Sequence, residues 1–282
     1  MVLYTQRYFS YLGQLKPVEH TAQLQRLVIA PEQFQASRIY LTSDQQHYLY
    51  HVLRLREGDR FIAMNGQGQL WLAELLPNPA EATVLEVLSE HTELTIPLKL
   101  LAAPPKGNHF DQVVRSVTEL GVSQIVPLIS QRTLLQPSPQ RIQRWRRIAT
   151  EAAEQSRRQM IPHIVDPLSF DDGIAKDNMD DGHHWQRYIC IVDAEAPNFL
   201  NCLNQWSEDE HETGIAVMVG PEGGWTDREK QQAQALGYQA VSLGQRTLRA
   251  VTATYMAVSV AIAHLERHTA YKGGHVCTKT SP

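Results

Sequence analysis

From Leu98 onward, short apolar stretches alternate with helix-like segments, and this alternation restricts the fold more than any other feature of the chain. In chain order the apolar stretches are LKLLAA (98–103), IVPLI (125–129), YICIV (188–192), IAVMVG (215–220) and AVSLG (240–244). The helix-like segments run to roughly 10–17 residues, the length of helices that connect parallel strands. The sequence therefore predicts an α/β fold built on a parallel sheet.

Two helices and a small β unit complete the expected elements. Within Asp111–Leu120 the apolar residues fall on one helical face, whereas Thr252–Arg267 is apolar almost all round. A helix of the second kind is buried, either in the core or in a subunit interface. Residues 38–88 are expected to be mainly β, with a helical stretch over Asp44–Leu55 and a hairpin turn at Gly66–Gly68.

Cysteine usage and the distribution of apolar residues restrict the class of protein. Cys190, Cys202 and Cys277 lie far apart, so neither a disulfide framework nor a structural zinc site is indicated. The N-terminal stretch lacks the sustained apolar core of a signal peptide, and no apolar run reaches about 18 residues, the length that crosses a membrane. We expect a cytoplasmic protein with no metal and no membrane partner.

The net charge of −4 conceals an uneven distribution of charge. Residues 132–158 contain seven arginines and two glutamates, whereas residues 166–181 contain six aspartates and one lysine. Residues 193–212 contain six acids and no lysine or arginine, and both acidic segments are expected to be solvated. A basic band of this kind lets an acidic protein hold a phosphate backbone. An ordinary charged surface helix is the alternative.

The most informative segment is IAVMVGPEGGWTDREK, residues 215–230. An apolar strand leads directly into the turn Gly220–Gly224 (GPEGG), and a helix is expected to begin near Thr226, because Glu229 follows it at the spacing of a capping box. A glycine-rich turn at the carboxyl end of a parallel strand is where α/β folds bind ligands. The turn is neither a dinucleotide fingerprint nor a P-loop. It is interpreted as a ligand-binding loop, and a tight turn with left-handed backbone is the alternative.

A second turn follows in AVSLGQRTLRAVTATYMAVSVAIA, residues 240–263. A strand leads to the turn Leu243–Gly244, then to Arg246 and Arg249, and then to the long apolar helix. If it lies next to the first turn, it closes a pocket from both sides. Because a charge just ahead of a buried helix is unusual, Arg249 either binds a carboxylate or faces an anion or a base.

Together the two turns resemble those of the SPOUT methyltransferases, and most closely those of the 16S ribosomal RNA uridine-N3 methyltransferase family (RsmE). The resemblance covers roughly residues 24–266. It rests on five blocks in the same order, HVLRLREGD (51–59), KGNHFDQVVRSVTELGVSQIVPLISQRT (106–133), RWRRIATEAAEQSRRQMIP (144–162), GPEGGW (220–225) and LGQRTLR (243–249). Five ordered blocks are far more specific than any one of them.

The resemblance implies an overall organisation that the residue patterns alone do not. It implies a PUA-like β-barrel that binds RNA at residues 24–94, and a SPOUT methyltransferase domain, a trefoil-knotted parallel sheet, at residues 95–267. Residues 1–23 would be an N-terminal extension without assignment, and residues 268–282 a flexible tail. Family members are homodimers whose active site draws on both subunits, which agrees with the apolar last helix.

The resemblance also implies a cofactor and a substrate. The cofactor would be S-adenosylmethionine, and the methylated atom would be N3 of a uridine in the decoding region of 16S rRNA in the small ribosomal subunit. The donor-binding residues implied by the family motifs are Gly220, Pro221, Glu222, Gly223, Gly224, Leu243, Gly244 and Leu248. The RNA-binding residues would be Arg54, Arg56, Arg132, Arg141, Arg144, Arg147, Arg157 and Arg158.

Two catalytic candidates follow from the chemistry of the implied reaction. Uracil N3 carries a proton that must leave, and a guanidinium beside the ring favours the uracil anion. Arg249 is the candidate for that role. Glu222 is a second candidate, for handling the proton, although bracing its loop through backbone N–H groups is the other role open to it.

The chain departs from the family pattern at three positions. Val251 stands where a glutamate is usual, Ser116 where a lysine is usual, and Gln131 where a glutamate is usual. If the lysine paired with one of the glutamates, losing both partners is nearly neutral; if the glutamate at 251 takes part in catalysis, activity is lower or the substrate is shifted. Two other functions therefore stay open: a non-catalytic RNA-binding or ribosome-assembly protein on the same fold, and a SPOUT methyltransferase that acts on tRNA.

Overall fold

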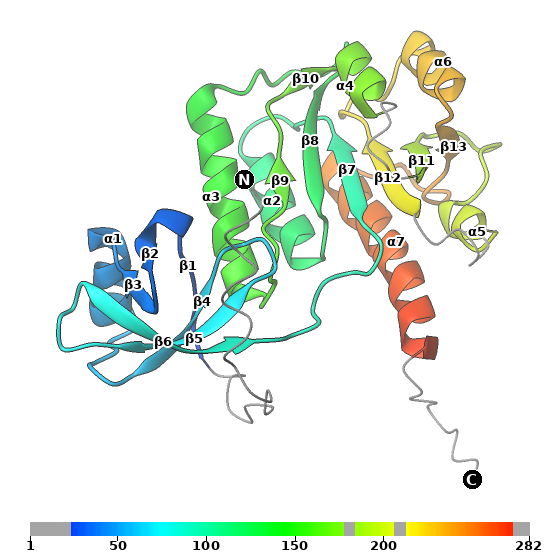
Figure 1. The fold of residues 1–282 in the computed structure, drawn as a ribbon. Helices are drawn as coiled ribbons and strands as arrows, with labels where there is room; N and C mark the ends of the chain where they lie inside the picture. Colours follow the sequence, from blue (N-terminus) through cyan, green and yellow to red (C-terminus); the bar gives the residue numbers. More distant parts are fainter. Residues whose placement is uncertain (1–23, 178–183, 206–212, 273–282) are drawn as a thin grey trace. The chain divides into compact units, whose positions relative to one another are not determined.

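A computed structural model describes residues 24–177, 184–205 and 213–272 (Figure 1). The chain divides into two compact units, residues 1–91 and 92–282, which are described separately as the first and the second unit. The expected extension 1–23 lies outside the described residues. Of the expected tail 268–282, residues 268–272 continue the last helix and the rest lies outside the described residues.

The described part of the first unit is a six-stranded sheet with short helical segments. Strand order is β1-β4-β5-β6-β3-β2, and all pairs are antiparallel except β1 with β4. The strands are β1 (Arg26–Val28), β2 (Phe34–Gln35), β3 (Arg38–Tyr40), β4 (Arg60–Met64), β5 (Leu70–Leu75) and β6 (Glu81–Leu88). A single 3₁₀ turn, η2 (Pro31–Gln33), precedes β2. Helix α1 (Ser43–Gln46) continues as a π-helical turn, η3 (His47–Val52).

Local signals in the sequence explain this arrangement. Thr42 caps α1, because its hydroxyl accepts the backbone N–H of Gln45 while the Gln45 side chain accepts that of Thr42. Strands β4 and β5 pair on either side of the glycine turn at residues 66–68. The predicted mainly β unit, its helical stretch and its hairpin are confirmed.

The second unit is a parallel sheet whose strands alternate with helices. Strand order is β10-β8-β7-β12-β11-β13, with β9 also paired to β8, and every pair is parallel. The strands are β7 (Leu98–Ala102), β8 (Gln124–Ile129), β9 (His163–Ile164), β10 (Leu168–Ser169), β11 (His184–Cys190), β12 (Thr213–Val219) and β13 (Gln239–Val241). The helices are α2 (His109–Glu119), α3 (Pro139–Gln155), α4 (Phe170–Asp177), α5 (Phe199–Leu203), α6 (Asp227–Ala235) and α7 (Ala250–Lys272). The predicted α/β fold with a parallel sheet is confirmed.

Both faces of this sheet are covered, which is why its strands are apolar without alternation. Along β12, Ile215, Val217 and Val219 pack into a core with residues of α2, α3, α5 and α7. The intervening Ala216 and Met218 pack into a second core with residues of α4 and α6.

Helix α7 is buried in the first of these two cores. Ala257, Val258, Ala261, Ile262 and Leu265 all belong to that core, and each is at most 6% exposed. Burial in the core was one of the two expectations for this apolar helix, and it is confirmed. Among the described residues, no helix is both long and apolar enough to span a membrane.

One expectation about charge is wrong. Asp177 lies in the segment that was expected to be solvated, yet it is 5% exposed. Its carboxylate accepts from Lys99 Nζ at 2.7 Å, from Arg187 Nε at 3.2 Å and from the Tyr238 hydroxyl at 2.5 Å. The aspartate is buried because these three donors, on β7, on β11 and just before β13, surround it; Lys99 and Tyr238 are distant from it in sequence.

Candidate active site

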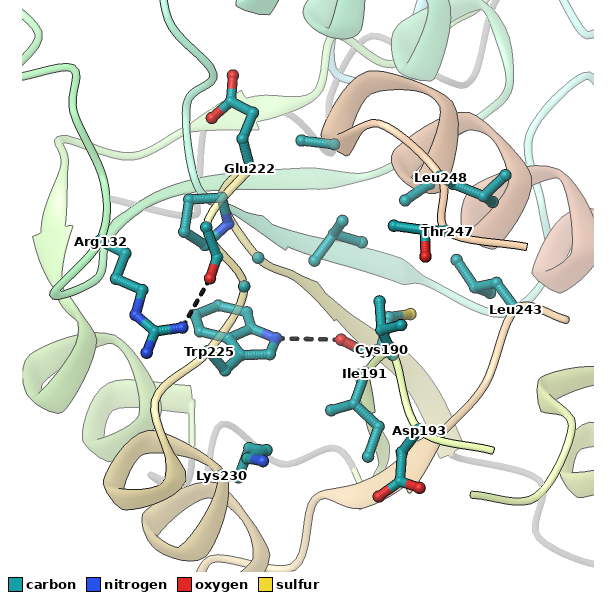
Figure 2. Close-up of a pocket in the computed structure, with 18 of the residues that line it drawn as sticks. Arg132, Cys190, Ile191, Asp193, Glu222, Trp225, Lys230, Leu243, Thr247 and Leu248 are labelled. Atoms are coloured by element: carbon teal, nitrogen blue, oxygen red, sulfur yellow. Dashed lines mark hydrogen bonds between the residues drawn. The ribbon is translucent and has the colours of Figure 1, made fainter. Parts of the chain in front are cut away.

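A cavity of about 250 Å³ lies at the carboxyl edge of the parallel sheet in the second unit (Figure 2). Three segments form most of its wall, and each follows the end of a neighbouring strand. They are residues 190–193 at the end of β11, residues 219–225 at the end of β12, and residues 243, 244, 246–248 and 250 after β13; Arg249 itself is not among the lining residues. The carboxyl ends of neighbouring parallel strands meet at one edge, so the strand order alone brings these distant segments together.

All eight residues expected to surround a donor line this one cavity. They are Gly220, Pro221, Glu222, Gly223, Gly224, Leu243, Gly244 and Leu248. The two glycine turns, which the sequence separates by some twenty residues, therefore lie beside each other. Arg249 is exposed and stands between Leu248 and Ala250, which both line the cavity.

The first turn owes its shape to local sequence. The Gly224 backbone N–H donates to the Pro221 carbonyl at 2.9 Å, and Gly224 has a left-handed φ of 67° that favours glycine. Thr226 then caps α6 in the predicted capping box with Glu229. Glycine turn and helix start thus form one unit, as expected from the sequence.

Trp225 fastens the first turn to the neighbouring strand. Its indole Nε1 donates to the Cys190 carbonyl at 3.1 Å (Figure 2), and the ring is buried. A Cβ added at Gly220 would lie 2.9 Å from the indole ring, so only glycine allows the strand end to pass this close. The tryptophan therefore joins two walls of the cavity.

Sequence reasoning missed the third wall of the cavity. Ile191, Val192 and Asp193 line it, and Asp193 lies opposite Arg132 and Glu222 in the close-up (Figure 2). This segment contains no glycine and matches no motif. Its position at the end of an apolar strand, next in the sheet to the strand that precedes GPEGG, is the signal that could have found it.

Arg132, which was expected to bind RNA, lies at the cavity. It lines the cavity, and its Nη1 donates to the Gly223 carbonyl at 2.7 Å (Figure 2). A Cβ at Gly223 would lie 3.2 Å from two carbons of the Arg132 side chain. The arginine is thus packed against the glycine turn as well as hydrogen-bonded to it.

The other predicted RNA-binding arginines fall into three groups. Arg54, Arg56 and Arg157 are exposed on irregular segments, and Arg144 and Arg147 are exposed on α3. Arg141, also on α3, is half-buried and donates to the Gly107 carbonyl and the Asn108 side chain. Arg158 is buried, with partners that are all protein groups. A phosphate cannot reach the buried guanidinium, so Arg158 does not fit the role expected of it.

A groove of about 440 Å³ runs between α2 and α3, and arginines line it. Arg115, Arg144 and Arg147 are the cations, and Asp111 and Glu151 are the acids. Arg144 pairs with Asp111 at 2.8 Å, and Arg115 lies 3.7 Å from Glu151. The predicted basic band therefore does present cations at the surface, though acidic neighbours hold two of them.

Glu222 is exposed and braces a neighbouring loop. Its Oε1 accepts the backbone N–H of Lys106 at 3.2 Å, in the loop that follows β7. This is the bracing contact that was the alternative to a role in proton transfer. The Cys190 thiol, which also lines the cavity, stays protonated at neutral pH because burial raises its pKa to about 12.

Among residues 24–177, 184–205 and 213–272, no group of histidine, cysteine or carboxylate side chains could hold a metal ion. The cavity therefore offers peptide groups, apolar side chains and charges of both signs to a ligand. That set suits a polar organic molecule with an aromatic ring.

Family models and known proteins match the chain over most of its length. A model described as an RNA methyltransferase domain matches residues 92–262, and one described as an RNA methyltransferase PUA domain matches residues 41–84. The ribosomal RNA small subunit methyltransferase E of Synechocystis is 43% identical over 242 residues, which cover 86% of this chain and 78% of that protein. The Bacillus subtilis protein of the same name is 27% identical, covering 80% of this chain and 90% of that one.

Solved structures agree with these matches. The crystal structure of a ribosomal RNA small subunit methyltransferase E from Neisseria gonorrhoeae, bound to S-adenosylmethionine, aligns with a TM-score of 0.74 and 28% identity. The alignment covers 87% of this chain and 98% of that one. Fold, cavity and family models thus define an RNA methyltransferase with a PUA-like domain. The chain belongs to the ribosomal RNA small subunit methyltransferase E family, as its sequence blocks predicted.

Proposed function

We propose that this protein transfers a methyl group from S-adenosylmethionine to N3 of a uridine in the decoding region of 16S rRNA. The observation that carries the proposal is the convergence of all eight expected donor residues on one cavity, in a chain of this family. Relatives carry the name ribosomal RNA small subunit methyltransferase E, and one of them was crystallised with S-adenosylmethionine.

The residues of the cavity fit this donor. Ile191, Leu243 and Leu248 offer apolar surface to an adenine ring, and the peptide groups of Gly220–Gly224 offer hydrogen bonds to its edge. Asp193 and Arg246, of opposite charge, suit the zwitterionic amino-acid end. The bound donor supplies a methyl group on a sulfonium, ready for in-line displacement. The task of the protein is to hold that methyl group and the accepting nitrogen in line.

Arg249 is our candidate for stabilising the uracil anion. Uracil N3 sits on the Watson–Crick edge, so the base must be unpaired and its N3 proton must leave. Arg249 is exposed at the start of α7, where its carbonyl accepts the Ala253 N–H at 2.8 Å. The positive end of the helix dipole therefore adds to the guanidinium charge. Glu222 is the second candidate, for the proton, although its bond to Lys106 favours a bracing role.

We propose that arginines at the surface follow the rRNA backbone. The candidates in the first unit are the exposed Arg54 and Arg56; those in the second are the exposed Arg132, Arg144, Arg147 and Arg157 and the half-buried Arg141. Cationic contacts of this kind release counterions, so binding weakens steeply with salt. A-form RNA is bound largely through its backbone, which suits a band of guanidinium groups.

The finer organisation is also part of the proposal. We infer a PUA-like barrel at residues 24–94 and a SPOUT domain at residues 95–267 whose cavity segments form a trefoil knot, a rare exception among folds. We infer a homodimer in the cytoplasm, as the resemblance to the family implies. Analytical ultracentrifugation tests the dimer.

The deciding experiment is mass spectrometry of 16S rRNA nucleosides from cells with and without the gene. Loss of 3-methyluridine on deletion, restored by the wild-type gene, supports the proposal. Unchanged 3-methyluridine contradicts it, and loss of a tRNA methylation instead identifies the tRNA enzyme. Calorimetry with S-adenosylmethionine separates the remaining alternative, because a non-catalytic assembly protein need not bind the donor.

A further inference from the structure

Glu229 makes a hydrogen bond to a neighbouring loop that helix capping does not require. Its side chain is buried at 5% exposure, and its Oε2 accepts the backbone N–H and the hydroxyl of Thr226 at 2.7 and 2.9 Å. These contacts complete the capping box of α6. The other oxygen, Oε1, accepts the backbone N–H of Gln131 at 2.8 Å. That bond reaches across to the loop after β8 and serves no purpose in capping.

The bond to Gln131 fixes the backbone from which Arg132 extends. The same loop is also closed on itself, since the Ser130 N–H donates to the Thr133 hydroxyl and the Thr133 N–H to the Ser130 carbonyl. Arg132 then donates from Nη1 to the Gly223 carbonyl at 2.7 Å. A buried carboxylate at the start of α6 is thereby connected, through the neighbouring loop, to the far side of the glycine turn.

We propose that Glu229 is a positioning residue for the donor site and that it acts through Arg132. Glu229 fixes the loop after β8 through the Gln131 N–H, and Arg132 extends from that loop to the Gly223 carbonyl of the turn Gly220–Gly224. A turn that binds a nucleoside by its backbone must be held in one conformation before the ligand arrives, because ordering it on binding costs affinity.

This inference rests on the proposed function, since it concerns the same cavity. Calorimetry with two probes tests it, S-adenosylmethionine and 5′-methylthioadenosine, which has the adenosine but lacks the amino-acid end. Arg132→Ala and Glu229→Gln should each lower the affinity for both probes about tenfold, which is the effect of losing one charge-assisted hydrogen bond. The double variant should bind no more weakly than Arg132→Ala, because Glu229 acts through Arg132.

Two matched variants serve as controls. Thr226→Ala removes the hydroxyl of the capping box but leaves the bond between Glu229 and Gln131. Because the inference attributes the effect to that bond and not to capping, this variant should change the affinity for either probe by less than about twofold. Arg228→Ala removes an exposed arginine of the same region, paired with Asp171 on α4, and should have no effect. Thermal unfolding shows whether Glu229→Gln folds; if it does not, Arg132→Ala alone decides, because its exposed side chain leaves the core intact.

Each result has a clear meaning. Unchanged affinity in Arg132→Ala overturns the inference, as does additive weakening in the double variant or an equal loss in Thr226→Ala. A lower affinity of Arg132→Ala for S-adenosylmethionine but not for 5′-methylthioadenosine also overturns the inference, since Arg132 would then contact the amino-acid end of the donor directly. A wild-type protein that binds neither probe refutes the proposed function itself, which is a different outcome.

Discussion

Arg158 and Glu93 form an ion pair in which Nη2 lies 2.6 Å from Oε2 and the arginine side chain is 4% exposed. The remaining guanidinium donors are also used, since Nη1 donates to the carbonyls of Thr118 and Val122 at 3.1 and 2.7 Å. Glu93 in turn accepts the backbone N–H groups of Gln159 and Met160. The pair therefore ties the C-terminal end of α3 to the segment that precedes β7.

Replacing Arg158 should cost stability rather than RNA affinity. Arg158→Ala leaves a carboxylate without its cation, so we expect a loss on the order of 3 kcal/mol in the free energy of unfolding. Arg147→Ala, on the exposed face of α3, should leave stability within about 0.5 kcal/mol. It should instead lower the slope of log affinity against log salt by about 1.

Urea denaturation and RNA binding at several salt concentrations measure the two effects. Each variant is the control for the other: Arg158→Ala should lower the free energy of unfolding and leave the salt slope unchanged, and Arg147→Ala should do the reverse. A lower salt slope in a folded Arg158→Ala protein would restore this residue to the RNA surface. An unchanged salt slope in Arg147→Ala would show that the groove between α2 and α3 is not part of the RNA-binding surface.

Gly244 should be essential for donor binding for a reason specific to its position. Its φ is 116°, and a Cβ there meets no protein atom within 4 Å, so it would project into open space beside the cavity. Gly244→Val should lower the affinity for S-adenosylmethionine at least tenfold, because the valine strains the backbone at this φ and its side chain blocks close approach of the ligand. Gly237, with a φ of 84° and equally open space, is the matched control before β13. If calorimetry gives the same loss for Gly237→Val, strain alone is responsible.

Cys190 should make stability fall at high pH. Burial raises the pKa of its thiol from an ordinary 9.0 to about 12, so the folded protein keeps it protonated. Above pH 9 only the unfolded chain loses this proton, and the stability contributed by the neutral thiol is lost as the pH rises toward 12. By pH 10.5 the loss from this one group is about 2 kcal/mol. Urea denaturation of wild type and Cys190→Ala at pH 8 and 10.5 measures it, and an equal drop in both proteins would contradict the assignment.

The sequence predicted two of the three cavity walls because their signals are local. A glycine turn directly after an apolar strand needs only its neighbours to be recognised, and so does the capping box of Thr226 and Glu229. The third wall, residues 191–193, carries no such signal. It becomes part of the cavity only because β11 lies beside β12, a pairing between strands that no short motif encodes.

The predictions that failed concern charges whose partners are distant in sequence. Asp177 and Arg158 lie in acidic and basic runs, and a charge run is usually a solvated surface. Asp177 meets Lys99 across 78 residues of chain, and Arg158 meets Glu93 across 65. Burial of a charge depends on such a partner, so composition alone could not reveal it.

Val251, where the resemblance to the family implies a glutamate, bears on how active the enzyme is. It is half-buried on α7 and packs against the core shared with α2 and α3. A valine suits that position, because apolar surface there is removed from water. Val251→Glu should therefore lower the free energy of unfolding by about 1–2 kcal/mol. If it raised the methylation rate as well, the usual glutamate would have a catalytic role that this chain has lost.

Arg249 is the residue on which the proposed mechanism depends most. If its guanidinium stabilises the uracil anion, it matters more in the transition state than in the bound complex. Arg249→Ala should therefore lower the single-turnover rate about a hundredfold, the effect of removing one oxyanion-type donor, while donor affinity changes little. Lysine should restore only part of the rate, because a point charge does not reproduce the planar guanidinium. The rate is measured at saturating donor and RNA, with Arg228→Ala as the control for loss of an exposed arginine. A near-normal rate in Arg249→Ala would limit this residue to binding RNA.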